Sequence, residues 1–176
     1  MRRIFIALGS LAALVAVVTV IGTMLPAGHV ASRSLVLKQP PESVWAVVTD
    51  YAGQPAWRKD ITKVERVSAG PGGEIWREDG SEALLLQTTE SVRPTRLVRT
   101  IADPTLPFGG RWVYAFEATA SGGTRLTVTE EGEVYNPIFR VVSRFMDPSA
   151  TIRSYLTSLA GRFGEAPLIE APAAGT

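Results

Sequence analysis

Few side chains in this sequence are able to do acid–base or metal chemistry. The chain has no cysteine and a single histidine, His29, so thiol catalysis is excluded and a Ser-His-Asp triad or a His-based metal site is hard to build. Three glutamates, Glu130, Glu131 and Glu133, cluster on one predicted strand, where only Glu131 and Glu133 share a face. We interpret this cluster as a solvent-exposed face. We therefore predict no catalytic residue, no metal and no cofactor.

The predicted strand 111–119 carries the large apolar residues that a binding site would use. Alternation on a strand places Trp112, Tyr114 and Phe116 on one face, and this aromatic face is expected to point inward. It would meet a C-terminal apolar stripe that includes Phe145, Ile152 and Leu156. The same pattern fits plain core packing or the wall of an apolar ligand cavity, because both need large apolar side chains.

Five further residues are candidates for such a cavity. Trp76 lies near a predicted turn, where it would rim a pocket or cover a corner of the core. Arg99 and Glu117 are candidate polar groups inside, and a buried charge needs a partner or a ligand. The turn "DPTLPFGG", residues 103–110, carries Leu106 and Phe108 beside two prolines. These two side chains are expected to cover a ligand, to dip into a membrane, or to fold back onto the core.

Periodicity along the chain predicts the elements that position these residues. A strand over 33–39 is followed by a short apolar helix that starts near Pro41. Six runs with a period of two follow, separated by Gly- and Pro-containing turns, at 61–67, 74–77, 83–92, 96–102, 111–119 and 125–134. Helices are predicted over 137–146 and 148–163, with Asp147 as a cap and Gly164 at the end of the second helix. An antiparallel sheet of seven strands with one apolar face requires the terminal helix as its cover.

Three stretches carry a resemblance to a known family. They are "PPESVWAVVTDYAGQPAW", "GRWVYAFEATASGGTRLTVTEEGEV" and "NPIFRVVSRFMDPSATIRSYLTSLAGRFGE". Together they resemble the START/polyketide-cyclase (SRPBCC) superfamily over residues 32–165. The resemblance implies an α+β helix-grip fold, in which a seven-stranded antiparallel curved sheet wraps around a long C-terminal helix, with a cavity between the two. It also implies that the 103–110 loop borders the mouth of that cavity, with Leu106 and Phe108 as a lid.

The N-terminal residues differ in character from this domain. Residues 4–25 hold no charge and follow Arg2 and Arg3, a pattern that predicts one transmembrane helix with residues 1–3 in the cytoplasm and the domain in the periplasm or outside the cell. A cleaved signal segment, which would make the protein secreted, is the alternative. Residues 26–31 are expected to be a linker and residues 166–176 a disordered tail.

Composition and resemblance together favour a binding protein. The net charge is +1, so no nucleic-acid partner is expected. Our leading hypothesis is a membrane-anchored domain that binds a hydrophobic small molecule or lipid. A cyclase/dehydratase-like enzyme and an envelope scaffold module are the alternatives, and the enzyme requires polar side chains that converge inside the cavity. Four arginines of the C-terminal helices, Arg140, Arg144, Arg153 and Arg162, would face solvent or anionic headgroups.

Overall fold

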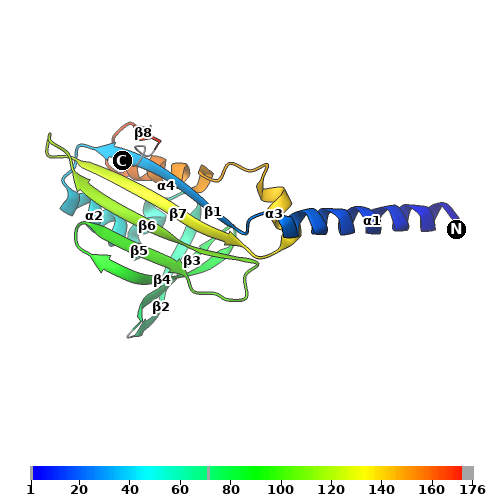
Figure 1. The fold of residues 1–176 in the computed structure, drawn as a ribbon. Coiled ribbons are helices and arrows are strands. Elements are labelled where there is room, and N and C mark those ends of the chain that lie inside the picture. The colour runs from blue at the N-terminus through cyan, green and yellow to red at the C-terminus, as the bar shows by residue number, and fades with distance from the viewer. Residues whose placement is uncertain (1, 71, 172–176) are drawn as a thin grey trace.

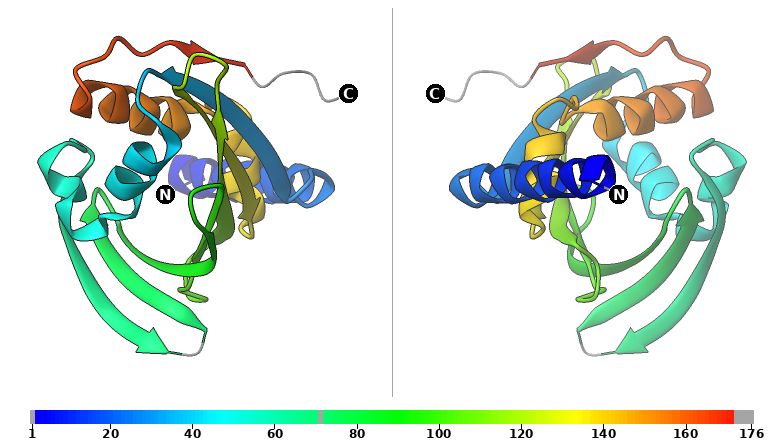
Figure 2. Two further views of the ribbon diagram at one scale, coloured as in Figure 1. Left: turned by 90° about the vertical axis from the view of Figure 1, so that its left-hand side faces the viewer. Right: turned by 90° about the vertical axis from the view of Figure 1, so that its right-hand side faces the viewer.

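One antiparallel sheet of eight strands curves around the helices (Figures 1 and 2). The structure is a computed structural model that describes residues 2–70 and 72–171, with side chains described from residue 5 except at residues 7 and 70. The strands are β1 (Gly28–Leu37), β2 (Ile61–Gly70), β3 (Gly73–Gly80), β4 (Ala83–Val92), β5 (Arg96–Ile101), β6 (Phe108–Ala118), β7 (Thr124–Val134) and β8 (Ile169–Glu170). Their order in the sheet is β2, β3, β4, β5, β6, β7, β1, β8. The predicted α+β helix-grip fold with its meander is confirmed.

The first and last strands differ from the sequence-based expectation. β1 begins at Gly28, inside the expected linker, and pairs with β7 along its whole length, from Gly28 opposite Glu133 to Leu37 opposite Thr124. The eighth strand, β8, comes from the segment expected to be disordered. It pairs Ser34 with Glu170 on the free edge of β1, so the sheet has eight strands rather than seven.

The helices begin and end where local chemistry favours it. They are α1 (Arg2–Met24), α2 (Pro41–Thr49), the 3-10 helix η1 (Tyr51–Ala56), α3 (Pro137–Ser143) and α4 (Ala150–Arg162). α4 starts two residues later than predicted, because the Asp147 carboxylate accepts hydrogen bonds from the backbone N–H and the hydroxyl of Ser149 at 2.9 and 2.8 Å and closes a turn there. Gly164 ends the helix with a positive φ of 68°, as expected for a C-terminal glycine.

The core lies between the concave face of the sheet and the helices α2 and α4 (Figure 2). α4 buries one stripe at helical spacing, and the strands contribute alternate residues. The core side chains that are almost completely buried are Leu35, Leu37, Val44, Val48, Leu97, Leu126, Val128, Ile152, Leu156 and Leu159. Burial of ten such side chains, at about 1.5–3 kcal/mol each, is the main stabilising contribution to the domain.

The N-terminal helix α1 extends away from the sheet at the end where α3 lies (Figure 1). Its side chains are described at positions 5–6 and 8–24, and the large apolar ones among them are mostly exposed. Counting only the described residues, no helix is both long enough and apolar enough to cross a membrane. The predicted transmembrane span is therefore not supported by the structure.

Candidate functional site

A cavity of about 450 Å³ opens at the α3 end of the domain, between the concave face of the sheet, α3 and the start of α4. Ile101 on β5, Phe108 and Trp112 on β6, Phe139 on α3 and Thr151 on α4 lie in its wall. The volume falls in the range that small-molecule sites occupy, and the wall is mostly apolar. The cavity can therefore hold a hydrophobic molecule of moderate size.

One carboxylate organises the polar part of the cavity wall. Glu130 on β7 accepts a hydrogen bond from the indole N–H of Trp112 at 2.9 Å, and its other oxygen lies 3.2 Å from Nε2 of His29. Both contacts hold the ring of Trp112 and the start of β1 against β7. The sequence predicts a solvent-exposed face for Glu130 and a linker for His29; the structure instead places both in the cavity wall.

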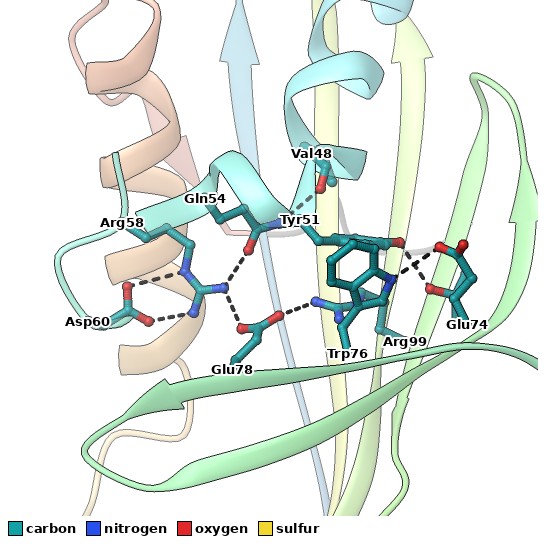
Figure 3. A network of polar contacts seen from close by, with 10 residues as sticks. Val48, Tyr51, Gln54, Arg58, Asp60, Glu74, Trp76, Glu78 and Arg99 are labelled. Carbon is teal, nitrogen blue, oxygen red and sulfur yellow. Dashed lines mark hydrogen bonds and ion pairs between the residues drawn. The ribbon is translucent and has the colours of Figure 1, made fainter. Parts of the chain in front are cut away.

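A second polar cluster lies deeper inside the grip, between η1, β3 and β5 (Figure 3). Its centre is Glu78 on β3, whose two carboxylate oxygens accept hydrogen bonds from Arg99 on β5 and from Arg58, the latter at 2.8 Å. Glu78 and Arg99 are only 4% and 3% exposed. Arg58 also donates to Asp60 and, at 2.9 Å, to the side-chain oxygen of Gln54. The cluster is thus a buried network of charges that satisfies much of its own hydrogen bonding.

The ring of Tyr51 covers one face of the Arg99 guanidinium. The Arg99 guanidinium lies over the ring of Tyr51 at 4.1 Å, a cation–π geometry, and the Tyr51 hydroxyl is 3.1 Å from the Thr88 hydroxyl. Within the described part of the chain, Nε and Nη2 of Arg99 and the hydroxyl of Tyr155 have no hydrogen-bond partner. These donors are therefore available to an acceptor that enters the interior, and until one does they carry a desolvation cost.

Burial and charge shift several pKa values around the cluster. Burial raises the pKa of Tyr114 to about 12 and raises that of Tyr155 well above its usual range, so both phenols stay protonated at neutral pH. Burial opposes charge on Arg58, but its hydrogen bond to Asp60 and the negative charges of Glu78 and Asp60 outweigh this and raise its pKa. Burial likewise opposes charge on Asp60, yet the hydrogen bond from Arg58 lowers its pKa.

The deep cluster and the cavity are neighbours along the same strands. Arg99 lies directly opposite Trp112 in the pairing of β5 with β6, and Ile101 follows Arg99 on the same face of β5. Since Trp112 and Ile101 both line the cavity, the deep cluster lies directly beside the cavity wall, on the side toward the interior of the domain.

The structure distributes the sequence-predicted site residues over several environments. Trp112 and Phe108 line the cavity. Tyr114, Phe116, Ile152 and Leu156 are buried in the core. Arg99 is buried in its ion pair, and the half-buried Trp76 packs edge-on against Tyr51. Leu106 is half-buried and lies outside the cavity wall, and Glu117 is exposed.

Phe145, like Glu117, points away from the interior. It is 88% exposed, so the expectation that it packs on the aromatic strand is wrong. The prediction continued one helical stripe across Asp147 and Pro148, but α3 ends at Ser143 and α4 begins at Ala150. The turn between them rotates Phe145 out of the phase that Ile152 and Leu156 follow.

Sequence reasoning missed Glu78, Arg58, Tyr51 and Tyr155 as members of the deep cluster. Alternation on β3 places Trp76 and Glu78 on one face, which was a usable signal for an inward carboxylate. The pairing of Glu78 with Arg99 joins residues 21 positions apart, and Arg58 reaches the same carboxylate from a loop. No local pattern indicates such contacts.

The curved sheet, the inner helix and the cavity between them define a helix-grip protein. The sequence matches the family described as polyketide cyclase/dehydrase and lipid transport over residues 29–162, and the chain belongs to this family. No curated protein sequence matches the chain.

Solved structures with the same fold share little sequence with it. A START superfamily protein from Mycobacterium smegmatis is 15% identical with a TM-score of 0.62, and the match covers 76% of this chain and 96% of that one. The Zhui aromatase/cyclase from Streptomyces sp. R1128 is 13% identical (TM-score 0.60; 77% and 93% covered). Norcoclaurine synthase from Thalictrum flavum is 11% identical (TM-score 0.62; 78% and 87% covered). At these identities the likeness establishes the fold alone.

Proposed function

We propose that this protein binds a hydrophobic small molecule or lipid in the cavity between the sheet, α3 and α4. The observation that supports this most is the cavity itself, about 450 Å³ with a mostly apolar wall that includes Phe108, Trp112 and Phe139. The Glu130 carboxylate gives the wall a polar point that would orient an amphipathic molecule. The membership of a family described by cyclase/dehydrase activity and lipid transport agrees with such a role.

Filling the cavity tests this proposal. Thr151 lines the cavity from the first turn of α4, so Thr151→Trp would place an indole in the space a ligand needs. We expect it to weaken the binding of the apolar dye anilinonaphthalene sulfonate by about tenfold or more, equivalent to about 1.4 kcal/mol. Native mass spectrometry after incubation with a total lipid extract should show a parallel loss of retained lipid.

A matched variant controls for the added ring. Thr157 is exposed on the same helix and does not line the cavity, so Thr157→Trp should leave dye binding and lipid retention unchanged. Equal binding by the wild type and Thr151→Trp, with unfolding curves that coincide, would contradict a ligand site in this cavity.

Catalysis on the bound molecule is the second candidate function. It is favoured by the convergence of Glu78, Arg99 and two neutral phenols, Tyr114 and Tyr155, inside the grip. Arg99 retains two donor nitrogen atoms, Nε and Nη2, and Tyr155 a hydroxyl, all able to polarise a carbonyl oxygen. The same mass measurement separates the two functions, because simple binding returns the ligand unchanged and a cyclisation with dehydration returns it lighter by one water. A scaffold role has less support, since a scaffold needs no cavity.

Attachment to a membrane, with the domain on its outer side, is the proposed location. It rests on the uncharged stretch 4–25 behind Arg2 and Arg3, and it agrees with the exposure of apolar side chains such as Phe5 and Leu14 on α1.

A single introduced thiol tests this location. Because the chain has no cysteine, Ser121→Cys in the exposed β6–β7 turn gives a single reactive thiol. We expect a membrane-impermeant maleimide to label it in spheroplasts, and the labelled chain to sediment with membranes. Labelling only after lysis would contradict the orientation, and a soluble, shortened chain would indicate a cleaved signal segment.

A further inference from the structure

The segment between β7 and α4 exposes a group of large apolar side chains. Ile138, Phe139, Val142, Phe145 and Met146, which we call the α3 patch, are between 40% and 88% exposed. Single exposed apolar residues are ordinary, but five within nine positions concentrate exposed apolar surface in one short segment. Such a surface marks an interaction site for something apolar.

The α3 patch borders the apolar surface of α1. The two helices pack closely, because a Cβ atom on Gly22 of α1 would lie 1.9 Å from the carbonyl oxygen of Pro137 at the start of α3. From this junction α1 extends away from the sheet (Figure 1), with Leu11, Leu14 and their apolar neighbours exposed. The medium that surrounds the exposed apolar side chains of α1 therefore also borders the α3 patch.

The charges around the α3 patch are positive. Arg140 and Arg144 lie within it, and residues 135–146 include no acidic residue. The next carboxylate, Asp147, forms an ion pair with Arg153 at 2.5 Å. Basic side chains beside exposed apolar ones are the arrangement that binds the interface of a bilayer with anionic headgroups.

Two residues of the α3 patch and the two arginines beside them also form part of the rim of the cavity. Phe139, Arg140, Arg144 and Met146 all line it, together with the carboxylates Glu130, Glu131, Glu133 and Asp147. Glu130 is held by Trp112 and His29, and Glu131 by Arg111 at 2.6 Å, so two of the four are engaged with donors on the sheet side. Asp147 is engaged by Arg153, and Glu133 lies on β7, on the sheet side of the rim. The α3 side of the rim is therefore basic and apolar.

We propose that the α3 patch docks on the surface of an anionic phospholipid bilayer and turns the cavity mouth toward the lipid. Phe145, Met146 and Val142 enter the interface, and the exposed guanidinium group of Arg144 contacts headgroup phosphates. Arg140, whose Nε donates to the backbone carbonyl of Val134 at 2.7 Å, adds positive charge beside it. This inference rests on the proposed function, and it identifies the source of the ligand as the bilayer. It requires contact between α3 and lipid, beyond any attachment through α1.

A single fluorescent label on the full-length chain tests this contact. Phe145→Cys introduces the only thiol, which is labelled with nitrobenzoxadiazole, and the chain is reconstituted in vesicles of equal parts phosphatidylcholine and phosphatidylglycerol. We expect the label to shift to shorter emission wavelength and to become protected from aqueous iodide. A label at Ser121→Cys, at the exposed β6–β7 turn, should remain fully quenched.

Charge variants test the role of the headgroups. Arg144→Glu on the labelled chain should weaken protection by about tenfold or more, because each basic residue near an anionic leaflet contributes about a factor of five. Arg162→Glu is the matched control, since Arg162 is exposed in the last turn of α4 and outside the cavity rim, and it should have no effect. In vesicles of phosphatidylcholine alone, protection of the wild type should fall to the level of Arg144→Glu.

Three outcomes would overturn the inference. Equal quenching of the Phe145→Cys label by iodide with and without vesicles would show that the α3 patch does not dock. Protection that rises with protein concentration in the absence of vesicles would assign the α3 patch to a second copy of the chain. Equal protection in neutral and anionic vesicles would remove the role of the arginines. Lipid retention measured on the same samples distinguishes the two proposals. An occupied cavity with a quenched label contradicts docking but not ligand binding. An empty cavity with a protected label contradicts ligand binding but not docking.

Discussion

Replacing Glu78 by glutamine is expected to lower the free energy of unfolding by about 3–5 kcal/mol. Glu78 is the shared anion of two guanidinium groups, and Arg99 has no other carboxylate among its described hydrogen-bond partners. Neutralising Glu78 leaves the 3%-exposed Arg99 charged in an apolar interior. Urea unfolding of the wild type and Glu78→Gln measures the difference.

Two companion variants separate the buried charge from simple loss of contacts. Arg99→Met leaves Glu78 paired with Arg58, so its cost should be clearly smaller than that of Glu78→Gln. The double variant Glu78→Met, Arg99→Met replaces the pair by apolar side chains and should be more stable than Glu78→Gln alone. If the double variant is instead the least stable of the three, the ion pair is net stabilising and the argument from uncompensated charge fails.

The positions whose environment depends on local alternation were predictable from the sequence. Trp112, Tyr114 and Phe116 lie on the inward face of β6 as expected, because a period of two assigns every residue of a strand to one face. The same holds for Ile152 and Leu156, which follow the helical period within α4. The choice between core packing and cavity wall was open because it depends on the space left between elements, which no strand or helix pattern encodes.

The residues that sequence reasoning misplaced depend on contacts between distant segments. Ile169 and Glu170 form a strand only because the edge of β1 is free to pair with them. Arg99 was a candidate for a buried charge, but its partner Glu78 comes from another strand. Phe108 and Leu106 share one short turn, and only Phe108, at the start of β6, reaches the cavity. The lid expected of both residues is thus a prediction that now concerns Phe108 alone.

A glycine in the cavity wall has the second large expected effect. Gly110 on β6 has a φ of 140°, and a Cβ atom there would lie 2.4 Å from the carbonyl oxygen of Glu131 on β7. Gly110→Ala therefore adds backbone strain of about 1–3 kcal/mol and also forces β6 and β7 to separate. We expect a loss of more than about 2 kcal/mol of unfolding free energy, measured by urea unfolding.

The same substitution at Gly122 provides the control for backbone strain. Gly122 has a φ of 83° in the β6–β7 turn, with no atom within 4 Å of a Cβ placed there. Gly122→Ala therefore adds backbone strain without a steric clash. Gly110 lines the cavity, whereas Gly122 lies outside its wall. Gly110→Ala should therefore also weaken binding of anilinonaphthalene sulfonate, and Gly122→Ala should not. Equal losses of stability with unchanged dye binding in both variants would show that the close approach of β6 and β7 at Gly110 does not shape the cavity.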